Sequence, residues 1–160
     1  MALAIGFDGT AQTIRRLASK RNTKTIHNDE LLMVATRELE VPKLRRIYGK
    51  AFIVQKISRN IHEPAVRDTL LAVATAADKL RVFSNRYNAF LLAAEITSQR
   101  VTFGKGTRIG TSKVAFCKAF NLPATFDNYQ ITDGEGRSSI YFQFRQGLLA
   151  RVTYDIGWLD

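Results

Sequence analysis

The chain has 160 residues, a length that fits one ordinary domain or two very small ones, and it is 46% hydrophobic and 24% charged. This composition excludes disorder throughout, and the single cysteine excludes an internal disulfide. Charges interrupt every apolar stretch before it reaches the length of a membrane-spanning helix. The net charge of +10 is uneven, because residues 1–60 hold 12 Lys and Arg against 5 Asp and Glu. The basic character is therefore mainly N-terminal.

Residues 8–28 are polar and basic, and we expect a tail or linker over residues 1–28. The apolar start, residues 1–7, lacks a basic region before it and a small-residue cleavage pattern after it, so it is not typical of a signal peptide. The expected location is the periplasm or the outer membrane if a signal was removed, and otherwise the cytoplasm.

Residues 29–100 carry the pattern of a helix followed by an antiparallel meander. Residues 29–35 fit either a helix or a first strand, and the pattern leaves both open. Pro42 suits the first turn of a helix and Gly49 suits its left-handed end, which predicts a short helix over residues 42–48. Strands are expected at residues 51–58, 69–75, 80–84 and 89–97.

Residues 101–160 repeat this order. Thr111 is a candidate N-cap, and Asn121 followed by Pro123 is typical of a helix end. Strands are expected at residues 126–132, 138–144 and 148–156. With an offset of 72 residues, Leu44 aligns with Phe116 and Gly49 aligns with Asn121. The sequence thus predicts an α+β fold in which two tandem units, each a short helix and a meander, form one sheet packed by helices.

The apolar faces of these elements define an expected core. Its members are Leu44, Ile47, Phe52, Val54, Leu80, Val82, Phe116, Phe120, Phe142, Phe144 and Val152.

Two segments resemble a known family. Residues 106–123 (GTRIGTSKVAFCKAFNLP) look like the start of the α+β repeat of BamE-type (SmpA/OmlA) envelope lipoproteins and of the β-lactamase inhibitor protein, and residues 140–152 (IYFQFRQGLLARV) look like its closing hairpin. Lys43 to Phe52 would be the corresponding start in the first unit. Asn121 stands where the family has glycine, and no lipoprotein signal is present. The resemblance implies a binding or scaffolding module without enzymatic activity.

Two clusters of basic residues are candidates for binding an anionic lipid surface or nucleic acid. A solvated tail and a solvated helix face are the plainer explanation of the same pattern. The candidate residues are Arg15, Arg16, Lys20, Arg21, Lys43, Arg45, Arg46 and Lys50.

Other motifs give no chemistry. Residues 104–110 read G-x-G-x-x-x-G, which departs from the spacing of phosphate-binding loops, so we expect a structural loop. His27 and His62 have no metal-ligand spacing, and Cys117 falls on an apolar helix stripe, where it should be a buried hydrophobic residue. No catalytic residue, metal site, cofactor or small-molecule substrate is expected.

The last two strands offer candidate surface contacts. Because side chains alternate along a strand, Phe142 and Phe144 should face the core, and Tyr141 and Arg151 should face outward. Trp158, near the C-terminus, either closes the sheet edge or contacts a partner, and the sequence leaves both open. The sequence therefore predicts a non-catalytic protein-binding or scaffolding module in a bacterial envelope. A protein that binds nucleic acid through its basic N-terminal third is the alternative.

Overall fold

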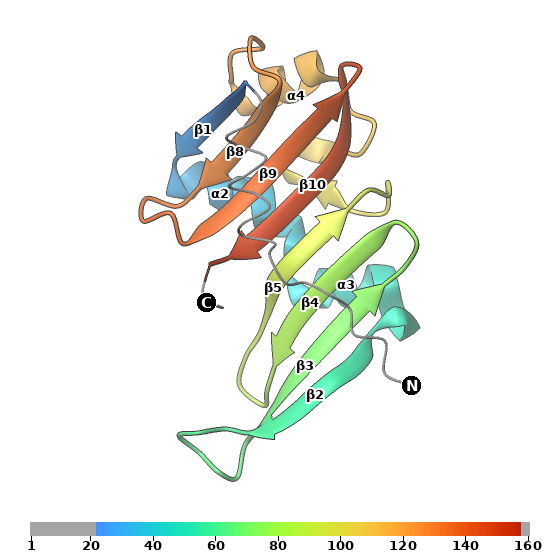
Figure 1. Cartoon of the computed structure of the whole chain (residues 1–160), viewed down its shortest axis with the longest axis vertical. Helices are drawn as coiled ribbons and strands as arrows, with labels where there is room; N and C mark the ends of the chain where they lie inside the picture. The colour runs from blue at the N-terminus through green and yellow to red at the C-terminus, as the bar shows by residue number, and fades with distance from the viewer. Residues whose placement is uncertain (1–21, 158–160) are drawn as a thin grey trace.

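A computed structural model describes residues 22–157 of the chain (Figure 1). Its helices are α2 (Asp29–Thr36), η1 (Arg37–Leu39), α3 (Val41–Tyr48), η2 (Gly49–Ala51), η3 (Gly104–Gly106) and α4 (Lys113–Phe120). Its strands are β1 (Thr23–His27), β2 (Ile53–Arg59), β3 (Arg67–Ala74), β4 (Asp78–Ser84), β5 (Ala89–Ile96), β6 (Thr102–Phe103), β7 (Thr107–Arg108), β8 (Asn128–Thr132), β9 (Ser138–Arg145) and β10 (Leu148–Ile156). No helix in this part of the chain has the length and apolar character that crossing a bilayer requires.

One eight-stranded sheet organises the molecule, in the order β1-β8-β9-β10-β5-β4-β3-β2. All neighbours are antiparallel except β1, which pairs with β8 in parallel, and β6 and β7 form a separate small hairpin. In Figure 1 the helices α2, α3 and α4 lie behind this sheet, so they cover one of its faces. Residues 23–27 were expected to belong to a tail, and this is wrong, because they form β1. The strands that the sequence predicts are all present, with small changes at their ends.

Local signals explain where the helices begin and end. Asn28 caps α2 by accepting a hydrogen bond from the Leu31 amide at 2.8 Å, so the segment that the sequence left open is a helix. Ser112, rather than Thr111, caps α4 through the Ala115 amide at 3.2 Å. Gly49 and Asn121 both have positive φ, +49° and +54°, at the ends of α3 and α4. Both helices end where the sequence predicts, but only Asn121 has the left-handed helical conformation, because the ψ of Gly49 is −118°.

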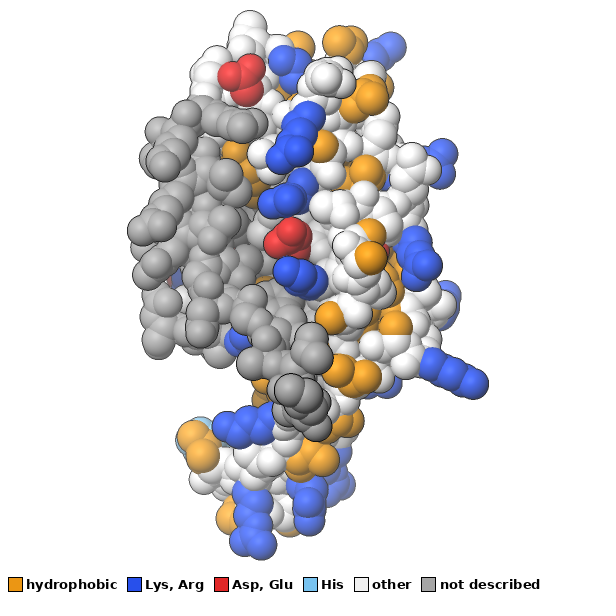
Figure 2. Space-filling view, turned by 45° about the vertical axis from the view of Figure 1, so that its right-hand side comes forward, with side chains coloured by type: hydrophobic (Ala, Val, Ile, Leu, Met, Phe, Trp, Pro, Cys, Tyr) orange, Lys and Arg blue, Asp and Glu red, His pale blue; other side chains and the backbone are white. Residues whose placement is uncertain are grey.

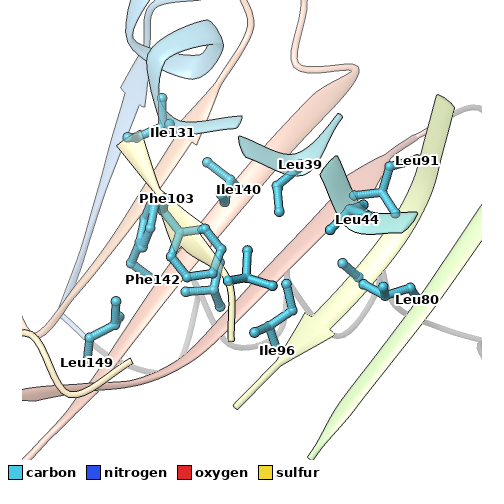
Figure 3. Close-up of a cluster of buried hydrophobic side chains, with 14 of the residues drawn as sticks. Leu39, Leu44, Leu80, Leu91, Ile96, Phe103, Ile131, Ile140, Phe142 and Leu149 are labelled. Atoms are coloured by element: carbon cyan, nitrogen blue, oxygen red, sulfur yellow. The ribbon is translucent and has the colours of Figure 1, made fainter. Parts of the chain in front are cut away.

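The core lies between the helices and the covered face of the sheet (Figure 3). Most of the expected core residues are buried there, while Ile47 and Phe52 pack partly buried against its margin. The expected burial of Val54 is wrong, because this residue is 57% exposed on the edge strand β2. The buried members of the expected core are Leu44, Leu80, Val82, Phe116, Phe120, Phe142, Phe144 and Val152.

The α+β class and the single sheet packed by helices are confirmed, but a tandem repeat is not evident. The first half supplies four strands of the sheet, and the second supplies three that are joined by the parallel strand β1. Helix α2 precedes the first meander in the chain and yet packs against β8 and β9 of the second. Because β5 pairs with β10, the segments 29–100 and 101–160 share one sheet and one core cluster.

Candidate functional site

The predicted basic residues divide into three groups. Arg15, Arg16, Lys20 and Arg21 lie outside the described residues. Lys43 is partly neutralised, because its ammonium lies 3.2 Å from a Glu38 oxygen and 3.5 Å from a Glu40 oxygen. The remaining predicted cations, Arg45, Arg46 and Lys50, are exposed at the end of α3 and in η2.

The predicted contacts on the sheet face are not brought together. Tyr141 is completely buried, so its assignment as an exposed contact is wrong. Tyr141 alternates with Phe142 along β9, and both are buried, so neither face of the strand is open here. Arg151 is half-buried and lies 3.7 Å from Glu95 on the neighbouring strand β5. Trp158 lies outside the described residues.

The most exposed element of the sheet is β2, at the opposite edge from β1. Every residue of β2 is exposed, including Ile53, Val54 and Ile57, whose exposed fractions are 53%, 57% and 53%. On its outer side no described strand pairs with it, so backbone N–H and C=O groups are open to a partner. Water-exposed apolar side chains grouped on a free sheet edge are typical of an interaction site.

The register of β2 places two of these apolar side chains on one face. Val54 lies opposite Leu71, and Ile57 lies opposite Thr69, two residues earlier on β3. They share a face although they are three residues apart, because the register shifts between Val54 and Lys56. Leu71 belongs to the core cluster, so this is the helix-covered face, continued beyond the cover of the helices.

Cations surround the apolar residues of β2. Lys56 and Arg59 are on the strand itself, and Arg67 of β3 lies directly opposite Arg59. All three side chains are exposed, and within residues 22–157 no carboxylate makes an ion pair with any of them. Figure 2 shows hydrophobic and basic side chains side by side at the narrow lower end of the molecule, where Figure 1 places β2 and β3.

The end of α3 extends the positive charge to the start of β2. The Arg45 guanidinium lies 5.8 Å from the ring centroid of Phe52, the residue just before the strand. Lys50 is exposed two residues earlier, in η2. We define the β2 surface by the residues of the strand edge and these neighbours: Ile53, Val54, Ile57, Lys56, Arg59, Arg67, Arg45, Arg46 and Lys50.

Sequence reasoning found the cations of α3 but missed the apolar half of this surface. Val54 was assigned to the core because β-branched strands are usually half-buried. The signal for an edge was present in Gln55, Lys56, Ser58 and Arg59, which put polar side chains on both faces of the strand.

Asp78 is a buried carboxylate, a type of group that can act in acid–base catalysis. It accepts hydrogen bonds from the Tyr48 hydroxyl at 2.9 Å, from the Thr97 and Ser98 amides at 3.0 Å each, and from the Ser98 hydroxyl. Burial raises the pKa of Asp78, but hydrogen bonds to its charged form outweigh burial, so the pKa lies below the ordinary value. Asp78 is therefore charged, and its four hydrogen bonds connect the end of α3 to the residues that follow β5.

Tyr48 and Tyr129 also have structural roles, because each hydroxyl donates a hydrogen bond to an oxygen of a neighbouring residue. Burial raises the pKa of Tyr48, and its hydrogen bond to the Asp78 carboxylate raises it further. Burial also raises the pKa of Tyr129, whose hydroxyl donates to the Pro123 carbonyl and accepts from the Cys117 thiol at 3.2 Å. The predicted burial of Cys117 is confirmed, and both tyrosines act as donors that tie a helix end to the rest of the fold.

The two histidines lie far apart on the sheet. His27 ends β1 at one edge, and His62 follows β2 at the other. Within the described part of the chain, no group of three or more His, Cys, Asp or Glu side chains is arranged to hold a metal ion.

The glycine loop at residues 104–106 packs against α2. A Cβ atom on Gly104 would lie 2.2 Å from the Val34 carbonyl oxygen, so only glycine permits this contact. Lys105 has a positive φ of 62°, and the Thr107 hydroxyl donates to the Gly104 carbonyl at 2.8 Å. These contacts support the structural role that the spacing predicts.

Comparisons of the chain with protein-family models, with curated proteins and with solved structures found no match.

Proposed function

We propose that this chain is a non-catalytic binding module that joins another protein through the β2 surface. The observation that carries the proposal is the edge strand β2, which has no strand on its outer side among residues 22–157 and on which Ile53, Val54 and Ile57 are each more than half exposed. An extended segment that adds to such an edge gains main-chain hydrogen bonds, while the side chains of the edge select the partner.

The chemistry of the described residues supports a binding role. The buried Asp78 and Tyr129 have their hydrogen-bonding groups occupied by neighbouring residues. The resemblance to envelope scaffolding modules, noted from residues 106–123 and 140–152, points to the same class of function and to a bacterial envelope. Mass spectrometry of the N-terminus after fractionation of the host cell tests the location, because a processed or lipid-modified end outside the cytoplasm supports it and an intact cytoplasmic Met1 contradicts it.

Site-specific photo-cross-linking in cells tests the binding role. A benzophenone amino acid at Ile57 should form a discrete protein adduct, and the adduct should disappear when Val54 is also changed to Thr. The matched control is the same amino acid at Val114, which is 70% exposed on α4, at the other end of the sheet. Equal labelling at both positions, or none at Ile57, would contradict a specific interface on β2.

Nucleic-acid binding is the second candidate function, and a specific observation favours it. Arg45, Arg46 and Lys50 are exposed, and none of them has an ion-pair partner among residues 22–157. If they contact phosphates, changing all three to Gln should weaken binding to a duplex oligonucleotide and lower the slope of its salt dependence. An unchanged slope in the triple variant would remove these residues from a nucleic-acid interface.

A further inference from the structure

We propose that the partner of the β2 surface is an extended, acidic segment of another protein, which pairs with β2 as an added strand. The proposal rests on the proposed binding function and names the chemistry of the partner. Apolar side chains of that segment would lie beside Val54 and Ile57, and its carboxylates would lie beside Lys56 and Arg59.

The cross-strand pair of Arg59 and Arg67 is the strongest sign of an anionic partner. These residues lie directly opposite each other on β2 and β3, and like charges in that position destabilise a sheet. Within residues 22–157 no carboxylate forms an ion pair with either guanidinium. A carboxylate brought by a partner strand would relieve this repulsion, so the pair favours an acidic segment over a neutral one.

Two acidic residues near this end of the hairpin, Glu63 and Asp68, accept hydrogen bonds from uncharged donors and form no ion pair among the described residues. Both Glu63 oxygens accept from the Tyr87 hydroxyl, at 3.0 and 3.1 Å. Asp68 accepts from the side-chain amides of Asn60, at 3.2 and 3.1 Å, and of Asn85, at 3.2 Å. Glu63, in the loop after β2, and Asp68, at the start of β3, are thus held by neighbouring side chains, and among residues 22–157 neither forms an ion pair with Lys56, Arg59 or Arg67.

The same charges disfavour a second copy of this chain as the occupant. Pairing of two β2 strands would bring Lys56, Arg59 and the cations of α3 from both copies into one interface. The register shift between Val54 and Lys56, and a lysine in the middle of the strand, are features by which natural edge strands avoid pairing with themselves. An acidic partner instead meets complementary charge.

The register indicates what the partner strand should carry. Val54, Ile57 and Arg59 lie opposite Leu71, Thr69 and Arg67, alternate residues of β3, and so share one face of the sheet. Ile53 and Lys56 lie opposite Ala72 and Leu70, on the other face. The register therefore fits a segment that has β-branched residues beside Val54 and Ile57 and an acidic residue on the other face, beside Lys56. A further acidic residue, on the same face as the β-branched ones, would lie beside Arg59.

Peptide binding measured by fluorescence anisotropy tests the proposal. The probe is a labelled peptide that alternates valine and glutamate but carries glutamate at the position beside Arg59 as well, and its control replaces each glutamate with lysine. We expect the acidic peptide to bind the full chain at least about tenfold more tightly than the basic one, which corresponds to about 1.4 kcal/mol. Raising the salt concentration should reduce this preference.

Charge reversal locates the contact. The double variant Lys56→Glu with Arg59→Glu should lose about tenfold in affinity for the acidic peptide. The matched control is Lys118→Glu, an exposed lysine on α4 whose reversal should leave the affinity unchanged. Circular dichroism before each titration confirms that the variants are folded.

Different results of these experiments would contradict the acidic partner and the binding function itself. Equal binding of both peptides, lost when Val54 and Ile57 are changed to Thr, would overturn the acidic partner and leave the binding function standing. Absence of the Ile57 cross-link would overturn the binding function itself. Displacement of the acidic peptide by a thymidine oligonucleotide, or self-association through β2 seen by light scattering, would overturn the proposal in favour of a nucleic acid or a second copy.

Discussion

The strands β9 and β2 both contain several apolar residues but occupy opposite environments. In β9, Ile140, Tyr141 and Phe142 are completely buried, because the strand lies inside the sheet with neighbours on both sides. In β2, Ile53, Val54 and Ile57 are exposed, because the strand is an edge that extends beyond the cover of the helices. The position of a strand in the sheet, more than its composition, decides whether its apolar side chains stabilise the fold or are free to bind.

The region around β9 should therefore carry the largest stability effects. Phe120→Ala removes a ring that packs 4.8 Å from Phe116 and 6.0 Å from Phe142, measured between centroids. We expect a loss of about 3–5 kcal/mol in the free energy of unfolding, measured by urea denaturation. The control Val114→Ala, on the exposed side of the same helix, should change it by less than about 0.5 kcal/mol. A small loss for Phe120→Ala would show that α4 does not pack on the sheet as described.

The Asp78 cluster joins the end of α3 to the start of β4 and the residues after β5, and its loss should be nearly as costly. Asp78→Ala removes the acceptor of four hydrogen bonds around a side chain that is 1% exposed. Each buried donor left without a partner costs about 1–3 kcal/mol, so we expect a loss of about 3 kcal/mol or more. Calorimetric unfolding at neutral pH measures the loss, and an effect below about 1 kcal/mol would contradict the described network.

The sign of the pH dependence follows from the lowered pKa of Asp78. The unfolded chain binds the proton more tightly than the folded one, so this contribution to stability is complete above the ordinary value of about 3.9 and is lost as pH falls through the folded pKa. Asp78→Asn keeps the shape of the side chain but has no such proton. Its stability should therefore fall less steeply than that of the wild type on acidification below about pH 5.

A single type of substitution compares the two strands directly. Ile140→Thr places a hydroxyl in the core and removes buried apolar volume, which should cost about 2–4 kcal/mol. Ile57→Thr makes the same change on β2, where the side chain is already 53% exposed, and should cost less than about 0.5 kcal/mol. Chemical denaturation of the two variants measures the difference, and equal losses would mean that β2 is covered in solution.

Much of the fold follows from local signals, and the unexpected features arise from long-range pairing. Pro42, Gly49 and Asn121 mark the helix boundaries, and alternating residues mark the meanders. Strand β1 was not predicted because Ile26 is its only large apolar residue and its partner β8 lies about a hundred positions later in the chain. The burial of Tyr141 was missed for a related reason, since alternation assigns one face to solvent and does not report what covers it.

The candidate site was predictable only in part. The cations of α3 stand out in the sequence, but their combination with β2 depends on which strand becomes the edge. That choice is made where β5 pairs with β10 and leaves β2 outermost. A sequence pattern of polar residues on both faces of residues 53–59 indicates an edge, but it does not reveal that the apolar residues of the same strand face water.

The smallest expected effect separates stability from binding on the β2 surface. Arg59→Glu replaces a repulsive cross-strand pair with an attractive one, because the new carboxylate lies opposite Arg67. We expect the free energy of unfolding to rise by about 0.2–1 kcal/mol, and thermal denaturation at low and high salt should show the gain shrinking as salt screens the pair. The same variant should bind the acidic peptide less tightly than the wild type. A gain in stability together with a loss of binding would mean that the two opposed arginines destabilise the fold and serve to bind an anionic partner. An unchanged stability would show that the arginines do not repel each other, and it would remove the strongest sign of that partner.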